Sequence, residues 1–442
     1  MKDFFRKHLP LITSILLTLI IIIFIGGEQL PKYARRLIIV GILFAIDMIY
    51  WTPTKRLVNK KWRPYVAVIY WMPLAVLLFY FFINSILPLS AWNSFFRAYY
   101  PAVMLILIIG KLSYLLVIFI VDIIKASVYL IKRNVLHIEG TVFRRSKVLL
   151  SSMALFSGVL MLLFFSGMIF WVHDYKVYNI DVPIKNLPQE FNDYKIVQLS
   201  DFHVGTYIND KEIKKISNIV NAQHPDAIVF TGDMVNLTSA EAVNFEKSFT
   251  TMHAPDGIYA ILGNHDYGEY ITWNSPEEKE LDVQHLKDFY KRIGWKLLLN
   301  ENKIIHKKDK SLAIVGVENW SVSKHFISKG NMQQAHRGAE HADVKILLSH
   351  DPSHWDAEIV PKYPDINLTL SGHTHAFQMA IEVGKIKMSP SSLLYKQWGG
   401  LYKSLKNNAE QYIYVNRGVG SLGYPGRIFT RPEITVLTLK NE

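Results

Sequence analysis

The sequence predicts an N-terminal, multi-span transmembrane α-helical region followed by an α/β domain with two packed mixed sheets flanked by helices. Half of the 442 residues are hydrophobic, and they crowd residues 1–172. Beyond this point, apolar runs of strand length alternate with segments of helical periodicity, and the chain closes with a strand-rich tail. We therefore expect a transmembrane region at 1–172, a linker with a first strand at 173–188 and the α/β domain at 189–442.

The N-terminal region contains five apolar stretches close to the length of about 20 residues that a bilayer core requires. They cover approximately residues 9–27, 37–52, 65–88, 100–122 and 149–172. The second is short and contains Asp47, so a re-entrant or interfacial helix is its alternative. The first resembles a signal peptide, but no A-x-A-like cleavage site follows it and further spans do, which favours an uncleaved anchor.

Two charged residues, Asp47 and Lys111, lie inside these stretches. Charges within a bilayer are costly, so they invite a functional interpretation. The simpler interpretation is that Asp47 lies near a membrane face, and that the long Lys111 side chain reaches the interface or meets a partner on another helix. We prefer the simpler interpretation.

The distribution of Lys and Arg predicts the orientation. Fourteen of them lie before the first span, between the second and third, and between the fourth and fifth, against four in the alternate loops. By the positive-inside rule, residues 1–8, 53–64 and 123–148 face the cytoplasm. Residues 173–442 then lie at the outer face of the cytoplasmic membrane.

The same distribution explains the net charge of +12 and the pI near 9.4. Residues 1–172 hold 19 of the 49 basic and five of the 37 acidic residues, which leaves 30 basic and 32 acidic residues for the remainder. The excess of positive charge therefore belongs to membrane topology, and we expect no nucleic-acid partner. The absence of cysteine is compatible with an exported domain but does not identify one.

Five short polar segments in the second region each follow an apolar run of strand length. The runs cover residues 194–200, 227–231, 258–262, 345–348 and 366–371. The segments that follow them are Asp201-Phe202-His203, Gly232-Asp233, Gly263-Asn264-His265, Ser349-His350 and Gly372-His373-Thr374-His375. Open α/β sheets bind ligands at the rim where such strand ends converge. The sequence therefore predicts one site built from all five segments.

Metal binding is the chemistry that this residue set suits. Each motif alone is compatible with an ordinary loop or turn, but their order and recurrence favour a shared two-metal site. Imidazole, carboxylate and amide ligands without a thiolate suit Mn, Fe or Zn. Asp233, whose two oxygens can reach both ions, is expected to bridge them. The other expected ligands are Asp201, His203 and His375 on one ion and Asn264, His350 and His373 on the other.

His265 follows a ligand but is not needed as one. Two ions about 3.5–4 Å apart clamp a phosphoryl group and convert a bridging water into a hydroxide nucleophile. We expect His265 to act as the catalytic residue beside them, as a proton donor to the leaving oxygen or a stabiliser of the transition state.

In this order, the motifs D-x-H, G-D, G-N-H, H and G-H-x-H resemble the calcineurin-like metallophosphoesterase superfamily, over roughly residues 180–442. The tail, with residues 412–418, Gly420, Arg427 and Arg431-Pro432-Glu433-Ile434, is similar to that of membrane-linked bacterial phosphoesterases of the YkuE and YaeI kind. The resemblance also implies two packed sheets flanked by helices. Expected helices cover residues 210–223, 239–252 and 276–293.

The sequence departs from the family pattern at two places. Asn236 stands where many members have an Asp, which replaces a carboxylate near His265 by an amide. The pKa of His265 is therefore expected to lie nearer the unperturbed value of about 6.5 than the pKa of a carboxylate-supported imidazole would. Residues 376–378, Ala-Phe-Gln, replace two glycines and a glutamine, so a relative's substrate does not transfer directly.

These features together favour a metal-dependent hydrolase of phosphate esters or pyrophosphates. Tethering at the membrane and the aromatic-rich stretch 395–402 make a phosphorylated lipid substrate attractive beside a small molecule, although this stretch is equally compatible with a packed loop. A nuclease of the same superfamily is an alternative, disfavoured by the slightly acidic domain. A membrane sensor that binds metal without turnover is another.

Overall fold

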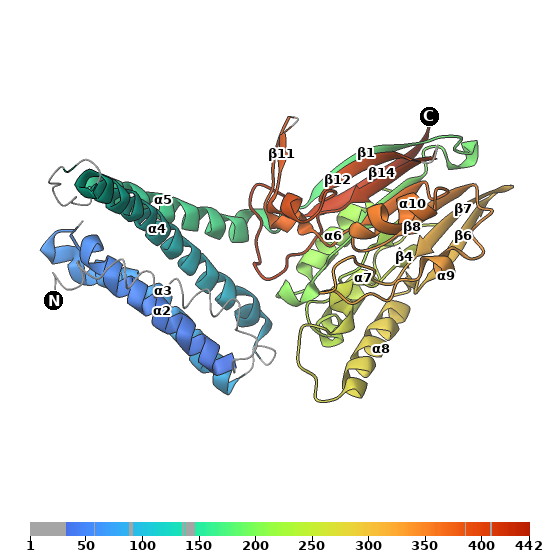
Figure 1. Ribbon diagram of the computed structural model, residues 1–442. Coiled ribbons are helices and arrows are strands. Elements are labelled where there is room, and N and C mark those ends of the chain that lie inside the picture. The colour runs from blue at the N-terminus through green and yellow to red at the C-terminus, as the bar shows by residue number, and fades with distance from the viewer. Residues whose placement is uncertain are drawn as a thin grey trace. The chain divides into compact units, whose positions relative to one another are not determined.

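The computed structural model describes residues 32–56, 58–87, 92–134, 137, 146–384, 386–406 and 409–442. Two compact units divide these residues. The first unit comprises the described residues up to 93 and those within 100–163. The second unit comprises residues 94–99 and the described residues within 164–442. Figure 1 labels the elements of both units.

The N-terminal elements are long helices. Their bounds are α2 Lys32–Thr54, α3 Arg63–Ile86, α4 Ser94–Asn134 and α5 Lys147–Ser166, which continues as the π-helical turn η4 Gly167–Trp171. Three helices within the described ranges are long and apolar enough to cross a membrane, namely Lys60–Ile86, Phe95–Tyr129 and Lys147–Trp171. They confirm the last three expected stretches as helices.

The first two expected stretches have a different outcome. Helix α2 covers residues 37–52, but it is not one of the three membrane-capable helices. The stretch at 9–27 lies outside the described residues. A total of five spans therefore stays a prediction.

The two charges inside the helices meet each other. Lys111 Nζ donates to Asp47 Oδ2 at 2.5 Å and to the Tyr70 carbonyl at 2.8 Å. Asp47 is buried, at 2% exposed. The expectation that Lys111 meets a partner on another helix is confirmed, and Asp47 is that partner.

The second unit is built on two six-stranded sheets. The first sheet has the order β1-β14-β2-β3-β4-β5 and the second β12-β13-β9-β8-β7-β6. Strands of the first are β1 Lys176–Ile184, β14 Glu433–Asn441, β2 Lys195–Leu199, β3 Ala227–Phe230, β4 Ile258–Ala260 and β5 Lys296–Leu297. Strands of the second are β12 Gly400–Lys406, β13 Ala409–Val415, β9 Leu368–Ser371, β8 Val344–Leu348, β7 Lys310–Gly316 and β6 Glu301–Lys307. Each sheet mixes parallel and antiparallel pairs, as the sequence predicts.

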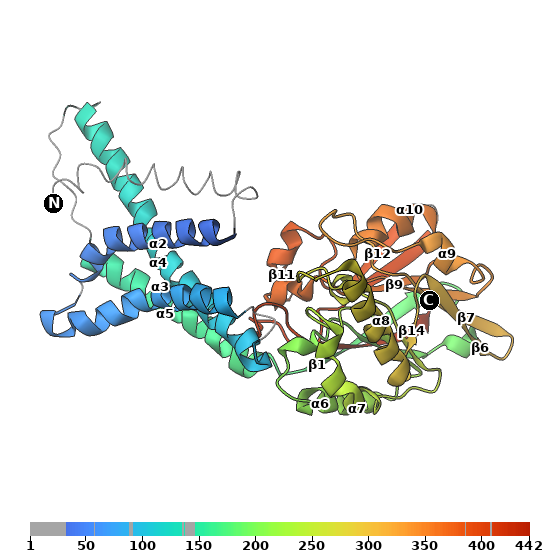
Figure 2. The same cartoon turned by 90° about the horizontal axis from the view of Figure 1, so that it is seen from below.

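Alternating strand residues build a separate apolar layer on each side of a sheet. Ile196 and Val229 lie in the cluster between the two sheets, whereas Val197 and Phe230 lie in the cluster under the outer helices. The helices of that outer layer are α6 Lys211–Asn221, α7 Glu246–Phe249 and α8 Pro276–Arg292. Those over the second sheet are α9 Met332–His336 and α10 Val360–Lys362. Figures 1 and 2 show these two helical layers on opposite sides of the sheets.

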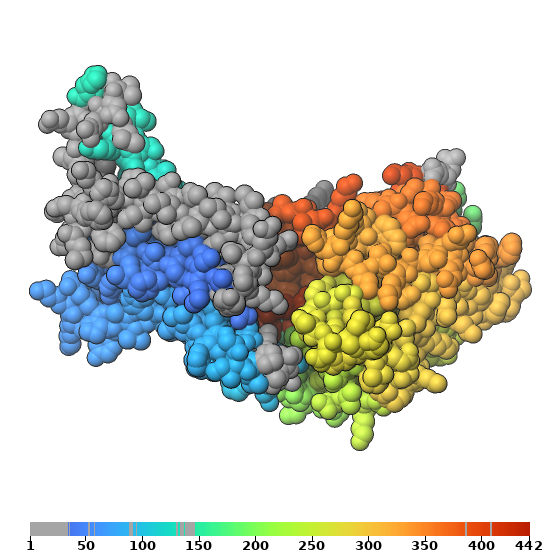
Figure 3. Space-filling model, turned by 60° about the horizontal axis from the view of Figure 1, so that its bottom comes forward, coloured from blue at the N-terminus to red at the C-terminus, as the bar shows by residue number. Residues whose placement is uncertain are grey.

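Two of the three expected helices in this unit are confirmed. Helix α6 occupies most of residues 210–223, and α8 occupies nearly all of 276–293. Figure 3 shows the α8 region, in yellow, on the outer surface.

The helix expected over 239–252 is wrong for most of its length, because two 3₁₀ turns, 239–241 and 243–245, precede the short α7. Side-chain acceptors bind backbone amides at the start of this segment. The Ser239 amide and hydroxyl donate to Asp282, and Glu241 Oε2 accepts from the Asn236 amide at 2.7 Å.

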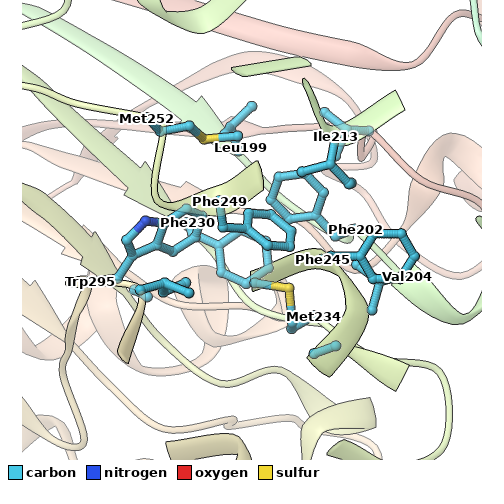
Figure 4. Packing of buried hydrophobic residues seen from close by; sticks show 14 of the residues in the cluster. Leu199, Phe202, Val204, Ile213, Phe230, Met234, Phe245, Phe249, Met252 and Trp295 are labelled. Atoms are coloured by element: carbon cyan, nitrogen blue, oxygen red, sulfur yellow. The ribbon is translucent and has the colours of Figure 1, made fainter. Parts of the chain in front are cut away.

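The core also places the first ligand motif. Phe202, between Asp201 and His203, is fully buried against Phe230 and Phe249, with ring centroids 5.2 and 4.9 Å apart. Figure 4 shows this aromatic cluster. Burial of the central residue fixes the two polar neighbours at the end of β2.

The ion pair between Asp47 and Lys111 gives a stability prediction. Asp47→Ala leaves the Lys111 ammonium without its carboxylate, and breaking a buried pair costs about 3–5 kcal/mol. We expect a lower thermal unfolding midpoint for the full-length protein in detergent. The matched variant, Asp47→Leu with Lys111→Met, should recover most of the loss, because apolar replacement of a buried pair is nearly neutral. An unchanged midpoint for Asp47→Ala would contradict the structural role.

Candidate metal centre

The five predicted motifs lie at the ends of five strands that come from both sheets. Strands β2, β3 and β4 are parallel neighbours in the first sheet, and β8 and β9 are parallel neighbours in the second. Parallel neighbours end on the same side, so their following loops meet at one rim. The structure brings the histidines and carboxylates of the predicted set together there in two groups.

One group contains Asp201, His203 and His375, all buried, with one possible ligand atom from each within 4.8 Å of the others. His203 Nε2 lies 3.1 Å from His375 Nε2, and His375 Nε2 lies 3.2 Å from Asp201 Oδ1. Two imidazole lone pairs and a carboxylate oxygen facing a common point are a donor set that a divalent ion fits.

The other group contains Asp233, His350 and His373. His373 Nδ1 lies 3.2 Å from His350 Nε2, which lies 3.1 Å from Asp233 Oδ2. The same Oδ2 atom is 3.6 Å from Nε2 of His203, a member of the first group. The Asp233 carboxylate therefore lies between the groups, where the sequence predicts the bridging ligand.

Hydrogen bonds on the outer side of three histidines orient the nitrogens that face the centre. The contacts are His203 Nδ1 with the Val235 carbonyl at 3.2 Å, His350 Nδ1 with the Thr231 carbonyl at 2.7 Å and His373 Nε2 with the Tyr395 hydroxyl at 2.9 Å. A carbonyl accepts only from an N–H, so in the neutral form of the first two rings the opposite nitrogens carry lone pairs toward the centre.

Asn264 lies at the same rim, and its side-chain oxygen is a further potential metal ligand. Its Nδ2 donates to the Tyr270 hydroxyl at 2.5 Å, whereas its buried Oδ1 has no hydrogen-bond partner among the described residues. An unpaired buried carbonyl oxygen is costly, and a bound cation would satisfy it. The amide thus fits the ligand role that the sequence predicts.

The carboxylates create a negative potential at the centre. Burial opposes a charge on His350, but the adjacent Asp233 outweighs this effect and raises the pKa of His350 to about 10. Burial also opposes ionisation of Asp233, yet His350 and His265 hold its pKa well below the usual range. A divalent ion would replace the imidazole proton in this field, and its binding would release protons.

The backbone of the site is strained. Positive φ angles occur at five of the seven predicted ligands, namely Asp201 (53°), His203 (46°), Asp233 (62°), His373 (69°) and His375 (50°). Non-glycine residues adopt this left-handed conformation rarely and at a cost of about 1–3 kcal/mol, and it clusters at functional sites. The motif glycine Gly372 permits the close packing, because a Cβ there would collide with the Asp201 carboxylate.

His265 lies beside both groups. Its ring packs edge-on against His203, with centroids 4.9 Å apart, and stacks on Tyr270 at 4.0 Å. Its Nδ1 meets the Asn236 backbone carbonyl at 2.8 Å, so the replacement of Asp by Asn at this position leaves a main-chain acceptor for the imidazole. Burial lowers the pKa of His265, and Asp233 and this carbonyl act in the opposite direction.

One organising residue was missed in the sequence. The buried Asp266 carboxylate accepts from the backbone amides of Asp233, Met234, Val235 and Gly263 at 2.8–3.3 Å. Burial, with the nearby Asp233 carboxylate, raises the pKa of Asp266 to about 7. Its position directly after the G-N-H motif was an available signal.

Aromatic side chains around the site were only partly foreseen. Tyr395 belongs to the predicted aromatic stretch and contacts His373 through its hydroxyl. Phe326 packs edge-on against His373 with centroids 4.8 Å apart, and Tyr270 covers His265. No local sequence motif marks Phe326 or Tyr270, because they reach the site only through loop folding.

The C-terminal tail supports the first ligand loop. The buried Arg427 guanidinium donates to the carbonyls of Arg417, Gly418 and Gly420. The Gly420 amide in turn donates to the Asp201 carbonyl at 2.9 Å. The tail residues that resemble the YkuE-like branch therefore hold the backbone of Asp201.

Comparisons with known proteins match the part of the chain that contains these residues. A sequence model of the family described as Calcineurin-like phosphoesterase matches residues 194–377. The metallophosphoesterase YkuE of Bacillus subtilis, described as uncharacterized, is 30% identical over 260 residues, which cover 58% of this chain and 82% of YkuE. A Danio rerio transmembrane protein with metallophosphoesterase domain is 28% identical over 60% of this chain and 57% of its own length.

A third relative carries a more specific name. The UDP-2,3-diacylglucosamine pyrophosphatase LpxG of Chlamydia muridarum is 26% identical over 57% of this chain and 86% of its own length. The region that the family model matches, residues 194–377, contains all five motifs and both groups of potential ligands. With its two-sheet fold and membrane-capable helices, the chain belongs to the calcineurin-like metallophosphoesterase family of metal-dependent hydrolases, in its YkuE-like branch.

Proposed function

We propose that the protein is a membrane-anchored phosphoesterase with two divalent ions, which hydrolyses a phosphate ester or pyrophosphate at the outer face of the cytoplasmic membrane. The position of Asp233 carries the proposal, because one carboxylate oxygen faces a histidine of each ligand group, at 3.6 and 3.1 Å. One ion would take Asp201, His203 and His375, and the other Asn264, His350 and His373. Manganese, iron and zinc all suit these donors.

The protein's own groups have separate tasks in this reaction. When bound, the ions would neutralise phosphoryl charge and activate water. The Asp266 carboxylate holds the backbone of Asp233, and the outer hydrogen bonds hold the imidazoles in their ligating tautomers. His265 would donate a proton to the leaving oxygen or stabilise the transition state. Because burial lowers its pKa, His265 should lose the proton, and with it the proton-donor role, at a lower pH than an ordinary imidazole does.

A lipid-linked pyrophosphate is the substrate class to test first. The relative named UDP-2,3-diacylglucosamine pyrophosphatase supports it, as do the membrane-capable helices of this chain. The full-length protein in detergent should be assayed with bis(4-nitrophenyl) phosphate and with mixed micelles containing CDP-diacylglycerol. Hydrolysis that disappears with a chelator and returns with Mn²⁺ supports the proposal. Metal binding without turnover of either probe would favour a sensor.

The first prediction of this proposal concerns the bridging position. Asp233→Asn removes the anionic oxygen between the two groups, so metal content should fall from about two ions per chain and kcat should fall at least about 100-fold. Elemental analysis and steady-state kinetics measure both effects. Asp288→Asn, an exposed change on α8, is the matched control and should alter neither. Retention of two ions and normal turnover would show that Asp233 does not bridge.

The second prediction concerns His265. His265→Ala should keep the metal content and lower kcat by about 10²–10⁴-fold, as expected for a positioned acid. The loss should be smaller for a nitrophenyl ester than for an alkyl ester, because nitrophenolate leaves without protonation. His285→Ala, at an exposed histidine of α8, serves as the control. Equal losses on both esters count against the acid role, and loss of metal would make His265 a ligand.

The third prediction concerns orientation. A C-terminal fusion should be active with a reporter that folds only outside the cytoplasm and silent with one that fluoresces only inside, because the positive loops face inward. A fusion within residues 123–148 should give the opposite result and is the internal control. A cytoplasmic signal at the C-terminus would reject the outer-face assignment, and intracellular phosphate esters would then become candidate substrates.

A further inference from the structure

Residues 377–394 expose large apolar side chains next to the metal centre. We call this set the apolar rim; it consists of Phe377, Ile381, Val383, Met388, Leu393 and Leu394. Leu393, Leu394 and Val383 are 87%, 76% and 68% exposed. So many neighbouring exposed apolar side chains mark an interaction surface.

Part of the apolar rim is an amphipathic hairpin. Strand β10, Ile381–Val383, pairs antiparallel with β11, Ile386–Met388, and Ile381 stands opposite Met388. Residues directly opposite each other share a face, as do residues two apart, so Ile381, Met388 and Val383 lie together. Glu382, on the other face, pairs with the buried Arg417. Figure 1 shows the hairpin, at the label β11, projecting from the domain.

The same compact unit contains the end of a membrane-capable helix. Helix Lys147–Trp171 is long and apolar enough to cross a bilayer, and its residues from Phe164 onward belong to the α/β unit. The Tyr424 hydroxyl donates to the Phe164 carbonyl, and the Arg427 amide donates to the Gly167 carbonyl at 3.3 Å. Trp171 packs on Phe429 with ring centroids 5.4 Å apart. The helix end is therefore fixed to the domain.

A shared cavity connects the hairpin with this helix end. It has a volume of about 950 Å³, and its walls include Trp171, Phe429, Ile381 and Val383. A helix that spans a bilayer ends near the boundary between acyl chains and headgroups, where Trp is enriched. The walls of one cavity lie close together, so the hairpin also lies near that boundary.

Basic side chains accompany the apolar ones. Lys387 is exposed and Lys176 lines the cavity, whereas Arg431 pairs with Asp174 in the cavity wall and the exposed Lys396 lies 4.0 Å from Asp356. Apolar side chains flanked by lysine and arginine suit an interface that combines acyl chains with anionic headgroups. A protein partner explains the apolar rim alone, but it does not explain why the rim lies beside the end of a membrane-capable helix.

We propose that the apolar rim inserts into the headgroup–acyl boundary of the leaflet in which helix Lys147–Trp171 ends. The metal centre then lies close to the bilayer surface, because Tyr395 follows Leu394 and contacts His373, and Phe377 lies two residues beyond His375. This position would give the metal centre access to lipid headgroup phosphates, a consequence that rests on the proposed function. The membrane contact itself does not depend on activity.

The absence of cysteine permits a direct measurement. Single variants Val383→Cys, Leu393→Cys and Leu394→Cys of the full-length protein would carry a nitroxide label in phosphatidylcholine–phosphatidylglycerol vesicles. Collision of the label with oxygen, which concentrates in the bilayer, is compared with collision with a water-soluble nickel chelate. The oxygen-to-nickel ratio should be severalfold higher at the apolar rim than for Leu281→Cys and Val322→Cys, two exposed apolar control positions.

Three other results would overturn the proposal. Ratios at the apolar rim equal to those of the controls would place it in water. Protection from both reagents, with only this protein in the vesicles, would mean that another copy covers it. A label at Leu394 that keeps its oxygen preference after Val383→Glu and Leu393→Glu would show that the rim does not act as one surface.

Each variant should first show a wild-type unfolding midpoint. Absence of hydrolysis with normal label depths would reject the proposed function alone.

Discussion

One buried carboxylate, that of Asp266, ties together the loops that follow β3 and β4. It accepts from four backbone amides, three in the loop of Asp233 and one at Gly263. Those loops carry Asp233, Asn264 and His265, and Asp233 adopts a left-handed backbone that is costly without support. Charge-assisted hydrogen bonds to amides are among the stronger stabilising contacts in a protein. The spacing between the two ligand groups depends on this arrangement.

A second support acts from the opposite side of the site. Arg427 donates to three carbonyls of the tail, and the tail donates to the Asp201 backbone. Ligands from the first sheet are thus held by a carboxyl group that accepts from backbone amides and a guanidinium that donates to backbone carbonyls. Both groups lie in the interior, where hydrogen bonds are stronger than in water and where a buried polar group without a partner is costly.

Periodicity and motif order were sufficient to predict the two-sheet domain, the strands before each ligand and the grouping of the histidines and carboxylates. They failed at residues 239–252, where two 3₁₀ turns replace most of the expected helix and Ser239 donates to Asp282 of α8. Asp266 and Tyr270 were missed for a related reason, since their roles arise from contacts that form only when loops pack. The left-handed angle at His375 is another property that residue type does not reveal. At Asn236, the atom that contacts His265 is a backbone carbonyl, so substitution of the side chain leaves it in place.

The anchoring of the last membrane-capable helix changes where the catalytic domain begins. Hydrogen bonds to the carbonyls of Phe164 and Gly167, with the contact of Trp171 on Phe429, make residues 164–171 part of the folded unit. Arg427, which bonds to Gly167, also holds the tail that supports Asp201. A soluble fragment cut at the apparent linker near residue 173 would lose this buttress, so protein engineering should preserve the final turns of the anchor. Detergents and bilayers of different thickness would then act on the catalytic centre through the same connection.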